Sequence, residues 1–271
     1  LIKGRVTLAD MENIKINLLS FSYEDKGKLI LKDINIEVQA GEFVCILGQS
    51  GCGKSTLLRL LAGLLKPTSG ELLIGGKKVE GASLERGVVF QDYGLFPWMT
   101  AGENILLALK QRFPGRTKQE LKQTAINMLL EVGLEESVYK MLPKELSGGM
   151  KQRCAIPQAF SMDPPILLMD EPFGALDAVP TARLQDLVPK LWAQDKPKKT
   201  VVFVTHDVDE AMRLANRIIV LGQSPSSIIY ECAIPEDGRP TRETQFENME
   251  MLRMRTKLIC QINRDVADHI E

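Results

Sequence analysis

Residues 48–56 read GQSGCGKST and fit the pattern G-x-x-x-x-G-K-[ST] from Gly48 to Ser55. The stretch before them, EFVCIL (42–47), is almost entirely apolar, as expected of a strand buried on both faces. The stretch after them, STLLRLLAG (55–63), has the leucine spacing of a helix that stops at its final glycine. A glycine-rich loop between a buried strand and a helix predicts a phosphate-binding loop, because its backbone N–H groups and the helix N-terminus attract the same anion.

The residue types in this loop suit a nucleoside triphosphate and Mg²⁺. Lys54 would bridge the β- and γ-phosphates, and the Ser55 hydroxyl would bind Mg²⁺. Cys52 serves as a small residue here, with its thiol near the bound phosphate. The alternative, a chance glycine-rich turn, does not account for the flanking strand and helix. We therefore expect the whole loop to contact nucleotide, namely Gly48, Gln49, Ser50, Gly51, Cys52, Gly53, Lys54, Ser55 and Thr56.

A second acidic motif follows another predicted core strand. ILLMDE (166–171) places two carboxylates after four apolar residues. In open α/β sheets such a strand delivers these side chains to its carboxyl end, the edge at which ligands bind. We expect Asp170 to hold Mg²⁺ through water and Glu171 to orient or deprotonate the attacking water. A solvated acidic turn is the alternative, and the phosphate loop makes it the weaker reading.

Two further polar residues end predicted core strands. His206 follows TVVFVT (200–205), and this edge position favours a contact with the γ-phosphate or the attacking water over a purely structural role. Gln91 ends GVVFQ (87–91) in the same way and would reach Mg²⁺ or water. His269 lies in the tail, and we assign it no role.

The pattern along the chain predicts an α/β fold with a P-loop NTPase core. KINLLSFSY (15–23) and LILKDINIEV (29–38) alternate apolar and polar residues, which predicts an N-terminal antiparallel β subdomain. GELLIGGKKV (70–79) reads as a hairpin. From about residue 100 to 160 the pattern is helical, and strands then resume as far as RIIVLG (217–222). Strands that alternate with helices predict a mostly parallel sheet, here interrupted by a helical insert.

The bulk composition excludes several classes of protein. The net charge of −1 disfavours a nucleic-acid binder, which usually carries a basic excess. No apolar run approaches the roughly 20 residues that a helix needs to cross a bilayer. The five cysteines are scattered and form no CxxC pair, which favours reduced thiols and a cytoplasmic setting.

The order of the motifs resembles that of the ATP-binding subunits of ABC transporters. The resemblance rests on GQSGCGKST, VVFQDYGLFPW, LSGGMKQR, ILLMDEP, GALD and VTHD, in that order. It implies that the chain binds ATP with Mg²⁺ and hydrolyses it. It also implies an ATP-binding domain over 13–222 with a helical subdomain at about 92–160, an N-terminal extension over 1–12 and a short C-terminal extension over 223–271.

LSGGM (146–150) is similar to the signature with which this family touches ATP bound to a second chain. Ser147 can cap a helix beginning near Lys151, and the glycines let another chain's γ-phosphate approach the helix N-terminus. Asp177 in GALD would lie at the same interface. Tyr23 matches the aromatic residue that stacks on adenine, the alternative being a surface strand aromatic. The resemblance implies contacts across the interface from Ser147, Gly148, Gly149, Lys151 and Gln152.

Trp98 in LFPWMTAGENI (95–105) and the short tail resemble the branch that imports nitrate, sulfonates and taurine. The resemblance implies a subunit that powers import of nitrate, bicarbonate, taurine or an alkanesulfonate through a separate membrane permease. Such a subunit is peripheral, on the cytoplasmic side of the inner membrane. Its partners would be a second copy of itself or a paralogous ATPase subunit, the permease and, indirectly, a substrate-binding protein, but no nucleic acid.

Three other functions compete with this one. A non-transport ABC ATPase acting on nucleic acid or ribosomes usually carries two ATPase halves, coiled-coil inserts or basic linkers, whereas this chain has a single set of motifs and no net positive charge. A small-molecule kinase would not need LSGGM. A regulatory subunit with weak hydrolysis, paired with a different ATPase, is disfavoured by the presence of Glu171 and His206, but sequence alone leaves it open.

The chain departs from the family pattern after the signature. The usual helix reads like QRVAIARAL, whereas here it is QRCAIPQAF (152–160), with Gln158 in place of an arginine. Pro157 falls inside this predicted helix, where a proline typically costs about 3 kcal/mol. In the next helix Pro180 fits the first turn, whereas Pro189 lies in the interior. We expect lower stability than in close relatives, with the chemistry intact.

Overall fold

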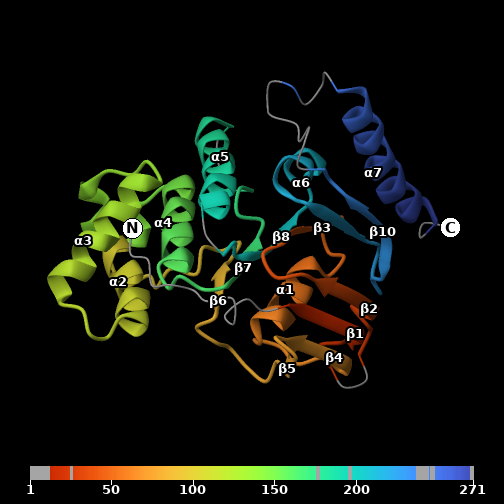
Figure 1. Cartoon of the computed structure of the whole chain (residues 1–271), viewed down its shortest axis with the longest axis horizontal. Coiled ribbons are helices and arrows are strands. Elements are labelled where there is room, and N and C mark those ends of the chain that lie inside the picture. The colour runs from red at the N-terminus through yellow and green to blue at the C-terminus, as the bar shows by residue number, and fades with distance from the viewer. Residues whose placement is uncertain are drawn as a thin grey trace. The chain divides into compact units, whose positions relative to one another are not determined.

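The computed structural model divides the chain into two compact units (Figure 1). The first unit comprises Leu1–Ser83 and Pro197–Glu271, and the second comprises Leu84–Lys196. The expected interface residue Asp177, the N-terminal extension over 1–12 and His269 lie outside the described residues. The structure describes residues 13–24, 27–174, 178–194, 197–235, 244 and 248–268.

An antiparallel sheet in the first unit confirms the predicted N-terminal β subdomain. In β2 the buried positions alternate with exposed ones along most of the strand, so one face packs on the core. Gly75 and Gly76 turn the chain between β4 and β5 with positive φ angles, as the predicted hairpin requires. The spatial order is β2-β1-β4-β5, with β1 (Ile14–Phe21), β2 (Leu31–Val38), β4 (Ser69–Ile74) and β5 (Lys77–Lys78).

The core strands of the first unit are mostly parallel, as predicted. β3 runs parallel to both β8 and β9, and every residue of β3 and β8 is buried. β10 pairs antiparallel with β9 at the sheet edge. The sequence did not predict β10, because its half-exposed residues follow the last apolar run and read as part of the tail. The bounds are β3 (Phe43–Leu47), β8 (Thr200–Thr205), β9 (Arg217–Leu221) and β10 (Ile228–Ala233).

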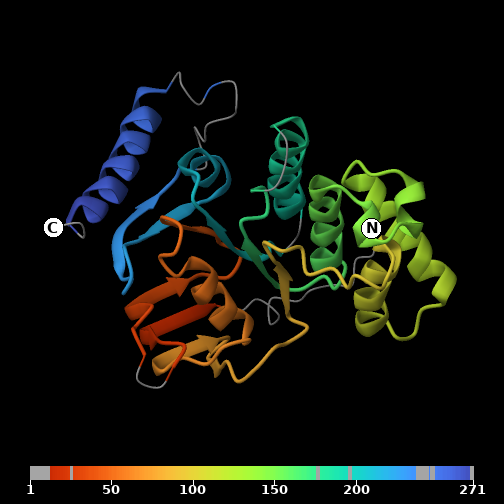
Figure 2. The ribbon, with the colours of Figure 1, turned by 180° about the vertical axis from the view of Figure 1, so that it is seen from behind.

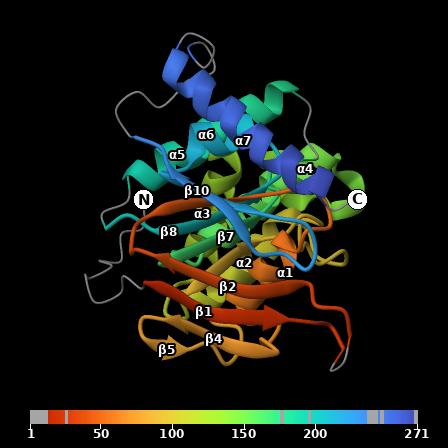
Figure 3. The same ribbon diagram turned by 90° about the vertical axis from the view of Figure 1, so that its right-hand side faces the viewer.

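Three helices of the first unit cover these strands. α1 (Lys54–Ala62) packs against β8 and ends at Gly63, whose left-handed conformation is the predicted stop. α6 (Val208–Leu214) packs against β3 and β8. α7 (Met249–Asp268) lies across α6 and β10 (Figure 3).

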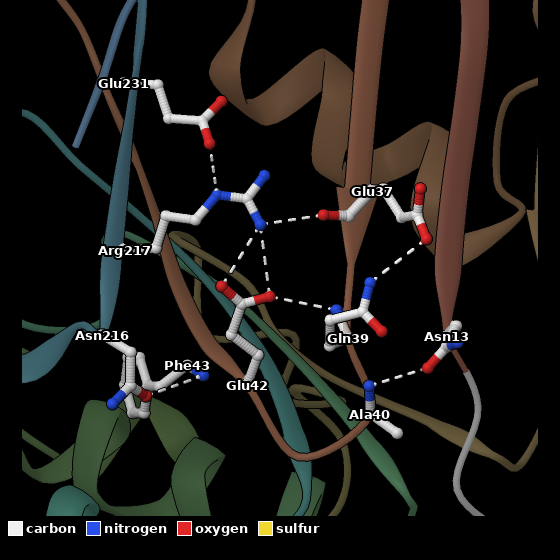
Figure 4. A network of polar contacts seen from close by, with 9 residues as sticks. All are labelled: Asn13, Glu37, Gln39, Ala40, Glu42, Phe43, Asn216, Arg217 and Glu231. Carbon is white, nitrogen blue, oxygen red and sulfur yellow. Dashed lines mark hydrogen bonds and ion pairs between the residues drawn. The ribbon is translucent and has the colours of Figure 1, made fainter. Parts of the chain in front are cut away.

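An arginine at the start of β9 joins the two sheets of the first unit (Figure 4). Arg217 Nη1 donates to the carbonyl oxygen of Glu37 at 2.8 Å and to the carboxylate of Glu42 at 3.2 and 3.3 Å. Its Nε donates to Glu231 Oε1 on β10 at 2.7 Å. The network lies at the amino ends of β3 and β9, so it braces the end of the sheet away from the phosphate loop.

The second unit combines two parallel strands with helices. α2, α3 and α4 pack on one another (Figure 2), which confirms the helical pattern predicted from about residue 100 to 160. None of the helices in the described part of the chain is long and apolar enough to span a bilayer. The elements are β6 (Arg86–Val89), α2 (Ala101–Arg112), α3 (Lys118–Glu131), α4 (Gly148–Phe160), β7 (Ile166–Asp170), α5 (Ala178–Gln194) and the short 3₁₀ helices η2 (Glu136–Lys140) and η3 (Pro143–Glu145).

Capping boxes fix the starts of α2 and α3. The side chain of Thr100 accepts from the backbone N–H of Glu103, whose carboxylate accepts from the backbone N–H of Thr100 at 2.8 Å. Thr117 and Glu120 repeat this arrangement at the start of α3. The backbone N–H of Thr100 lowers the pKa of Glu103, and the hydroxyl of Thr117 lowers the pKa of Glu120. Both carboxylates therefore stay ionised where they cap the helices.

The three prolines occupy the helix positions that the sequence predicted. Pro157 is inside α4, which continues beyond it, because the N–H of Ser161 donates to the Pro157 carbonyl oxygen at 2.8 Å. Pro189 is inside α5, whereas Pro180 is in its first turn. Within the described residues the side-chain oxygen of Gln158 is buried and has no hydrogen-bond partner. An interior proline and an unpaired buried oxygen both oppose stability.

We predict that Pro157→Ala raises the melting temperature by roughly 5 °C or more, because alanine restores the N–H and relieves the clash with the preceding turn. Pro180→Ala is the matched control and should change the melting temperature little, since first-turn N–H groups have no partner within the helix. Differential scanning calorimetry measures both. Equal melting temperatures for Pro157→Ala and the wild type would mean that α4 accommodates this proline without cost.

Candidate functional site

Three glycines shape the phosphate loop that follows β3. A Cβ on Gly48 would lie 2.7 Å from Cys52 Sγ and 2.9 Å from the carbonyl oxygen of Leu221, so no side chain fits there. Gly51 and Gly53 have φ angles of 83° and 96°, a left-handed conformation that favours glycine. The predicted loop is thus present in the first unit, and its glycines are required by its backbone.

Lys54 is the first residue of α1, and its side chain folds back over the loop. Lys54 is only 4% exposed, and its Nζ donates to the carbonyl oxygens of Gly48 at 2.9 Å and Gln49 at 2.8 Å. A buried ammonium group therefore lies where the N–H groups at the start of α1 also concentrate positive charge. This arrangement suits a polyanion such as a chain of phosphates.

Tyr23 lies beside the loop. Its hydroxyl is 3.0 Å from Oγ1 of Thr56 in α1, and its ring packs edge-to-face on Phe21 with centroids 5.0 Å apart. Although it is held in this way, Tyr23 remains 57% exposed. The structure therefore brings the predicted adenine-stacking residue to the phosphate loop with ring surface available.

Cys52 is a buried member of the loop. Burial raises the pKa of its thiol, so the side chain is protonated at neutral pH. It adds no charge where the phosphates are expected, which agrees with its predicted role as a small residue.

His206 joins β8 to α6 at the same edge of the first unit. β8 and β3 are parallel and in register, with Thr205 beside Leu47, so His206 follows β8 where the phosphate loop follows β3. The hydroxyl of Thr205 donates to the buried Glu210 carboxylate at 2.7 Å and accepts from the N–H of Asp207 at 3.0 Å. The exposed His206 is thus held between two anchored neighbours.

Three residues predicted to act in catalysis or to bind Mg²⁺ share one edge of the second unit. β6 and β7 are parallel, with Val89 beside Met169, so their carboxyl ends coincide. Gln91 follows β6 and is exposed, and Asp170 ends β7 and is buried. Glu171 comes next, half-buried, with a φ of 44°. A left-handed glutamate is uncommon, and such backbone strain concentrates at functional positions.

The glycine pair of LSGGM is helical, which corrects the expected start of this helix. α4 begins at Gly148, three residues before the predicted start near Lys151. The side chain of Ser147 accepts from the N–H of Met150 at 3.3 Å, so the predicted cap is confirmed. The low helix propensity of two glycines pointed to a turn, but the cap and the packing of α4 override it. Gly149 therefore exposes helix backbone rather than loop backbone.

Two further residues of the signature differ in exposure. Lys151 is half-exposed, and its Nζ lies 6.0 Å from the ring centre of Tyr93. Gln152 is only 1% exposed, and among the described residues neither atom of its amide finds a hydrogen-bond partner. Gln152 is thus buried in the single chain, and its contact with ATP on a second chain stays a prediction.

The described residues contain no group of three or more histidine, cysteine, aspartate or glutamate side chains placed to hold a metal ion. Mg²⁺ at phosphates usually needs only one or two protein oxygens, since water and phosphate supply the rest. The hydroxyl of Ser55, the carboxylate of Asp170 and the amide oxygen of Gln91 are such donors. Their chemistry fits a magnesium ion that arrives with the nucleotide.

Several contacts that support the phosphate loop were not predicted from the sequence. Gln223 Nε2, in the loop after β9, donates to Gln49 Oε1 in the phosphate loop at 3.2 Å. The hydroxyl of Ser226, from the same loop, donates to the carbonyl oxygen of Cys52. These residues are about 174 positions apart along the chain, so no local pattern could have linked them.

The chain is similar to known proteins over most of its length. A family model described as ABC transporter matches residues 31–174. The nitrate import ATP-binding protein NrtD of Synechococcus elongatus is 43% identical over 238 residues, which cover 88% of this chain and 86% of that protein. The aliphatic sulfonates import ATP-binding protein SsuB of Bacillus cereus is 40% identical, with 90% and 92% covered. Among solved structures, the chain resembles the ATP-binding cassette MJ0796 in a dimeric post-hydrolysis state bound to ADP and Pi. The TM-score is 0.74 and the sequence identity is 34%, and the match covers 82% of this chain and 99% of the MJ0796 chain.

Proposed function

Since the chain belongs to the ABC transporter family, we propose that it is the ATP-hydrolysing subunit that powers import of a small anion through a separate permease. The observation that carries this proposal is the buried ammonium group of Lys54 inside a glycine-shaped loop at a helix N-terminus. Relatives named for nitrate and aliphatic sulfonates support an anionic solute of the nitrate, bicarbonate, taurine or alkanesulfonate kind.

In the proposed reaction the first unit binds the nucleotide. The loop N–H groups and Lys54 would hold the phosphates, and the exposed ring of Tyr23 would stack on adenine. Lys54 would exchange its bonds to the loop carbonyls for bonds to phosphate oxygens. His206, held at the neighbouring strand end, would contact the γ-phosphate or the attacking water.

The second unit would supply the groups for hydrolysis. Glu171 would orient the attacking water and accept its proton. Asp170 and Gln91, together with the Ser55 hydroxyl of the first unit, would hold Mg²⁺. When bound, this ion supplies positive charge that neutralises the β- and γ-phosphate oxygens.

We propose that two such subunits pair, either as two copies or with a paralogous subunit. The dimeric cassette structures among the relatives support pairing. Ser147 is exposed at the start of α4, and the two glycines after it place no side chain over the helix N-terminus. This helix end would contact the γ-phosphate of ATP held by the other chain. Lys151 would add a positive charge one turn further along.

An aromatic pair in the second unit would bind the permease. Trp98 is 73% exposed and Phe96 38% exposed, with ring centroids 5.5 Å apart. Buried Asn104 fixes this loop, because its Oδ1 accepts from the Phe96 N–H at 2.7 Å and its Nδ2 donates to the carbonyl oxygens of Met99 and Thr100 at 3.1 and 3.0 Å. Rigid, exposed aromatic side chains are typical anchors of protein interfaces.

The proposed assembly has two further consequences. The subunit would be peripheral, on the cytoplasmic side of the inner membrane, held there by its permease. Solute would be chosen by the permease and by a substrate-binding protein that the subunit does not itself contact.

We predict that Glu171→Gln lowers the rate of ATP hydrolysis by about 100-fold or more, because the amide cannot accept the proton of the attacking water. The variant should still bind Mg-ATP and accumulate as an ATP-bound dimer, measured by light scattering after size exclusion. Glu131→Gln, at the exposed end of α3, is the matched control and should behave as wild type. Wild-type turnover in Glu171→Gln would remove Glu171 from the catalytic role.

We predict that Trp98→Ala reduces copurification of the permease at least about tenfold, because it deletes an exposed aromatic anchor. The melting temperature should change little, since the side chain is mostly solvent-exposed. Met249→Ala removes an exposed apolar side chain of the first unit, 64% exposed, and should leave the complex intact. Undiminished copurification with Trp98→Ala would place the permease contact elsewhere.

A further inference from the structure

One face of α7 carries both apolar anchors and charged side chains. Met251 and Leu258 of α7 are buried, and α7 packs against α6 and β10 (Figure 3). Arg255 and Asp265 follow Met251 at spacings that return to the same side of a helix. Both charged residues therefore face the neighbours on which the anchors are packed.

Arg255 contacts the segment that holds His206. Its Nε and Nη2 donate to the two carboxylate oxygens of Asp209 at 2.7 and 3.1 Å. The hydrogen bonds that Arg255 donates to the Asp209 carboxylate raise the pKa of Arg255. Asp209 lies in the first turn of α6, and Asp207, which caps that turn, directly follows His206. Half-exposed ion pairs add little to folding stability, but a two-pronged contact fixes geometry.

Asp265 contacts the loop that supports the phosphate loop. Its Oδ2 accepts from the backbone N–H of Gln223 at 2.7 Å, and Gln223 Nε2 donates to Gln49 Oε1 at 3.2 Å. The carbonyl oxygen of Gln49 in turn accepts from Lys54 Nζ at 2.8 Å. A Cβ on Gly222 would lie 2.7 Å from Asp265 Oδ1 and 2.8 Å from Ile229 Cγ2, so glycine at position 222 leaves room for the carboxylate beside Gln223.

Ser226, in the same loop after β9 as Gln223, makes a second contact with the phosphate loop. The residue is completely buried, and its hydroxyl donates to the carbonyl oxygen of Cys52. Its N–H donates to the carbonyl oxygen of Ile30 at 2.8 Å, and its own carbonyl oxygen accepts from the N–H of Lys32 at 2.8 Å. A displacement of this loop would therefore displace the phosphate loop.

We propose that α7 positions the ATP-binding edge of the first unit, with Asp265 acting on the phosphate loop through Gln223 and Arg255 acting on the His206 segment through Asp209. The inference rests on the proposed function and extends it to a helix at the end of the chain. Asp265 and Arg255 are positioning residues, since each is argued to act through another residue, Gln223 for Asp265 and Asp209 for Arg255. Loosening the phosphate loop should weaken nucleotide binding, whereas displacing His206 should slow hydrolysis.

The Asp265 contact is tested by steady-state ATP hydrolysis of the full chain. Asp265→Ala should raise KM for ATP by about fivefold with kcat within about twofold of wild type. Asp265→Asn keeps an oxygen that accepts from the Gln223 N–H and should restore KM to within about twofold. A wild-type KM in Asp265→Ala, or equal impairment in both variants, would overturn the Asp265 contact as a positioning device.

Gly222→Ala tests the same contact without altering Asp265. The added methyl group should push the carboxylate from Gln223 and raise KM about as much as Asp265→Ala does. The thermal unfolding midpoint of each variant shows that the fold is retained. A folded Gly222→Ala protein with wild-type KM would contradict the proposal.

The Arg255 contact is tested by charge reversal. Arg255→Asp should lower kcat by about fivefold with little change in KM. The double variant Asp209→Arg with Arg255→Asp restores the opposite charges and should recover most of the lost kcat. Arg253→Asp, at an exposed position of α7, is the matched control and should behave as wild type. A wild-type kcat in Arg255→Asp, or no recovery in the double variant, would overturn this part.

The two levels of the proposal fail in different ways. A wild-type chain that does not hydrolyse ATP, alone or with its permease, would overturn the proposed function. A wild-type chain that hydrolyses ATP while every α7 variant matches it would overturn only the role of α7.

Discussion

The hydrogen bonding of the buried Lys54 ammonium group is the interaction on which the proposed nucleotide site depends. A buried charge is unfavourable unless it is hydrogen-bonded, and here two loop carbonyl oxygens satisfy it. Those bonds require the carbonyl groups of Gly48 and Gln49 to point toward the lysine, and the left-handed Gly51 and Gly53 let the rest of the loop turn tightly into α1. Lysine and loop thus fix each other, and together they present positive charge at the start of α1.

Parallel strand pairing then brings the other functional residues to the strand ends. In the first unit the register of β3 and β8 places His206 beside the phosphate loop. In the second unit the register of β6 and β7 places Gln91 with Asp170 and Glu171. Each of these residues needs only to follow a buried strand, because parallel strands end at the same edge of their sheet. In the first unit, long-range contacts of α7 with Asp209 and Gln223 are the ones we propose to hold the strand ends in position.

Much of this arrangement could be predicted because it depends on patterns of neighbouring residues in the sequence. The phosphate loop, the apolar runs of β3, β7 and β8, and the glycine that ends α1 all follow from neighbouring residues. The start of α4 could not be predicted, since packing and the Ser147 cap outweigh the poor helix propensity of two glycines. β10 could not be predicted either, because its half-exposed residues show too weak an alternation of buried and exposed positions. The contacts of Gln223 and Asp265 depend on residues distant in sequence, so they needed the fold.

The most direct test of the central claim is the affinity of Lys54→Met for Mg-ATP, measured by isothermal titration calorimetry on the full chain. Methionine keeps much of the side-chain length but removes the charge and its hydrogen bonds. We predict that the dissociation constant rises by roughly ten- to a hundredfold while the protein stays folded. An unchanged dissociation constant in a folded Lys54→Met protein would contradict it, because the phosphates would then be held without the group around which the loop is built.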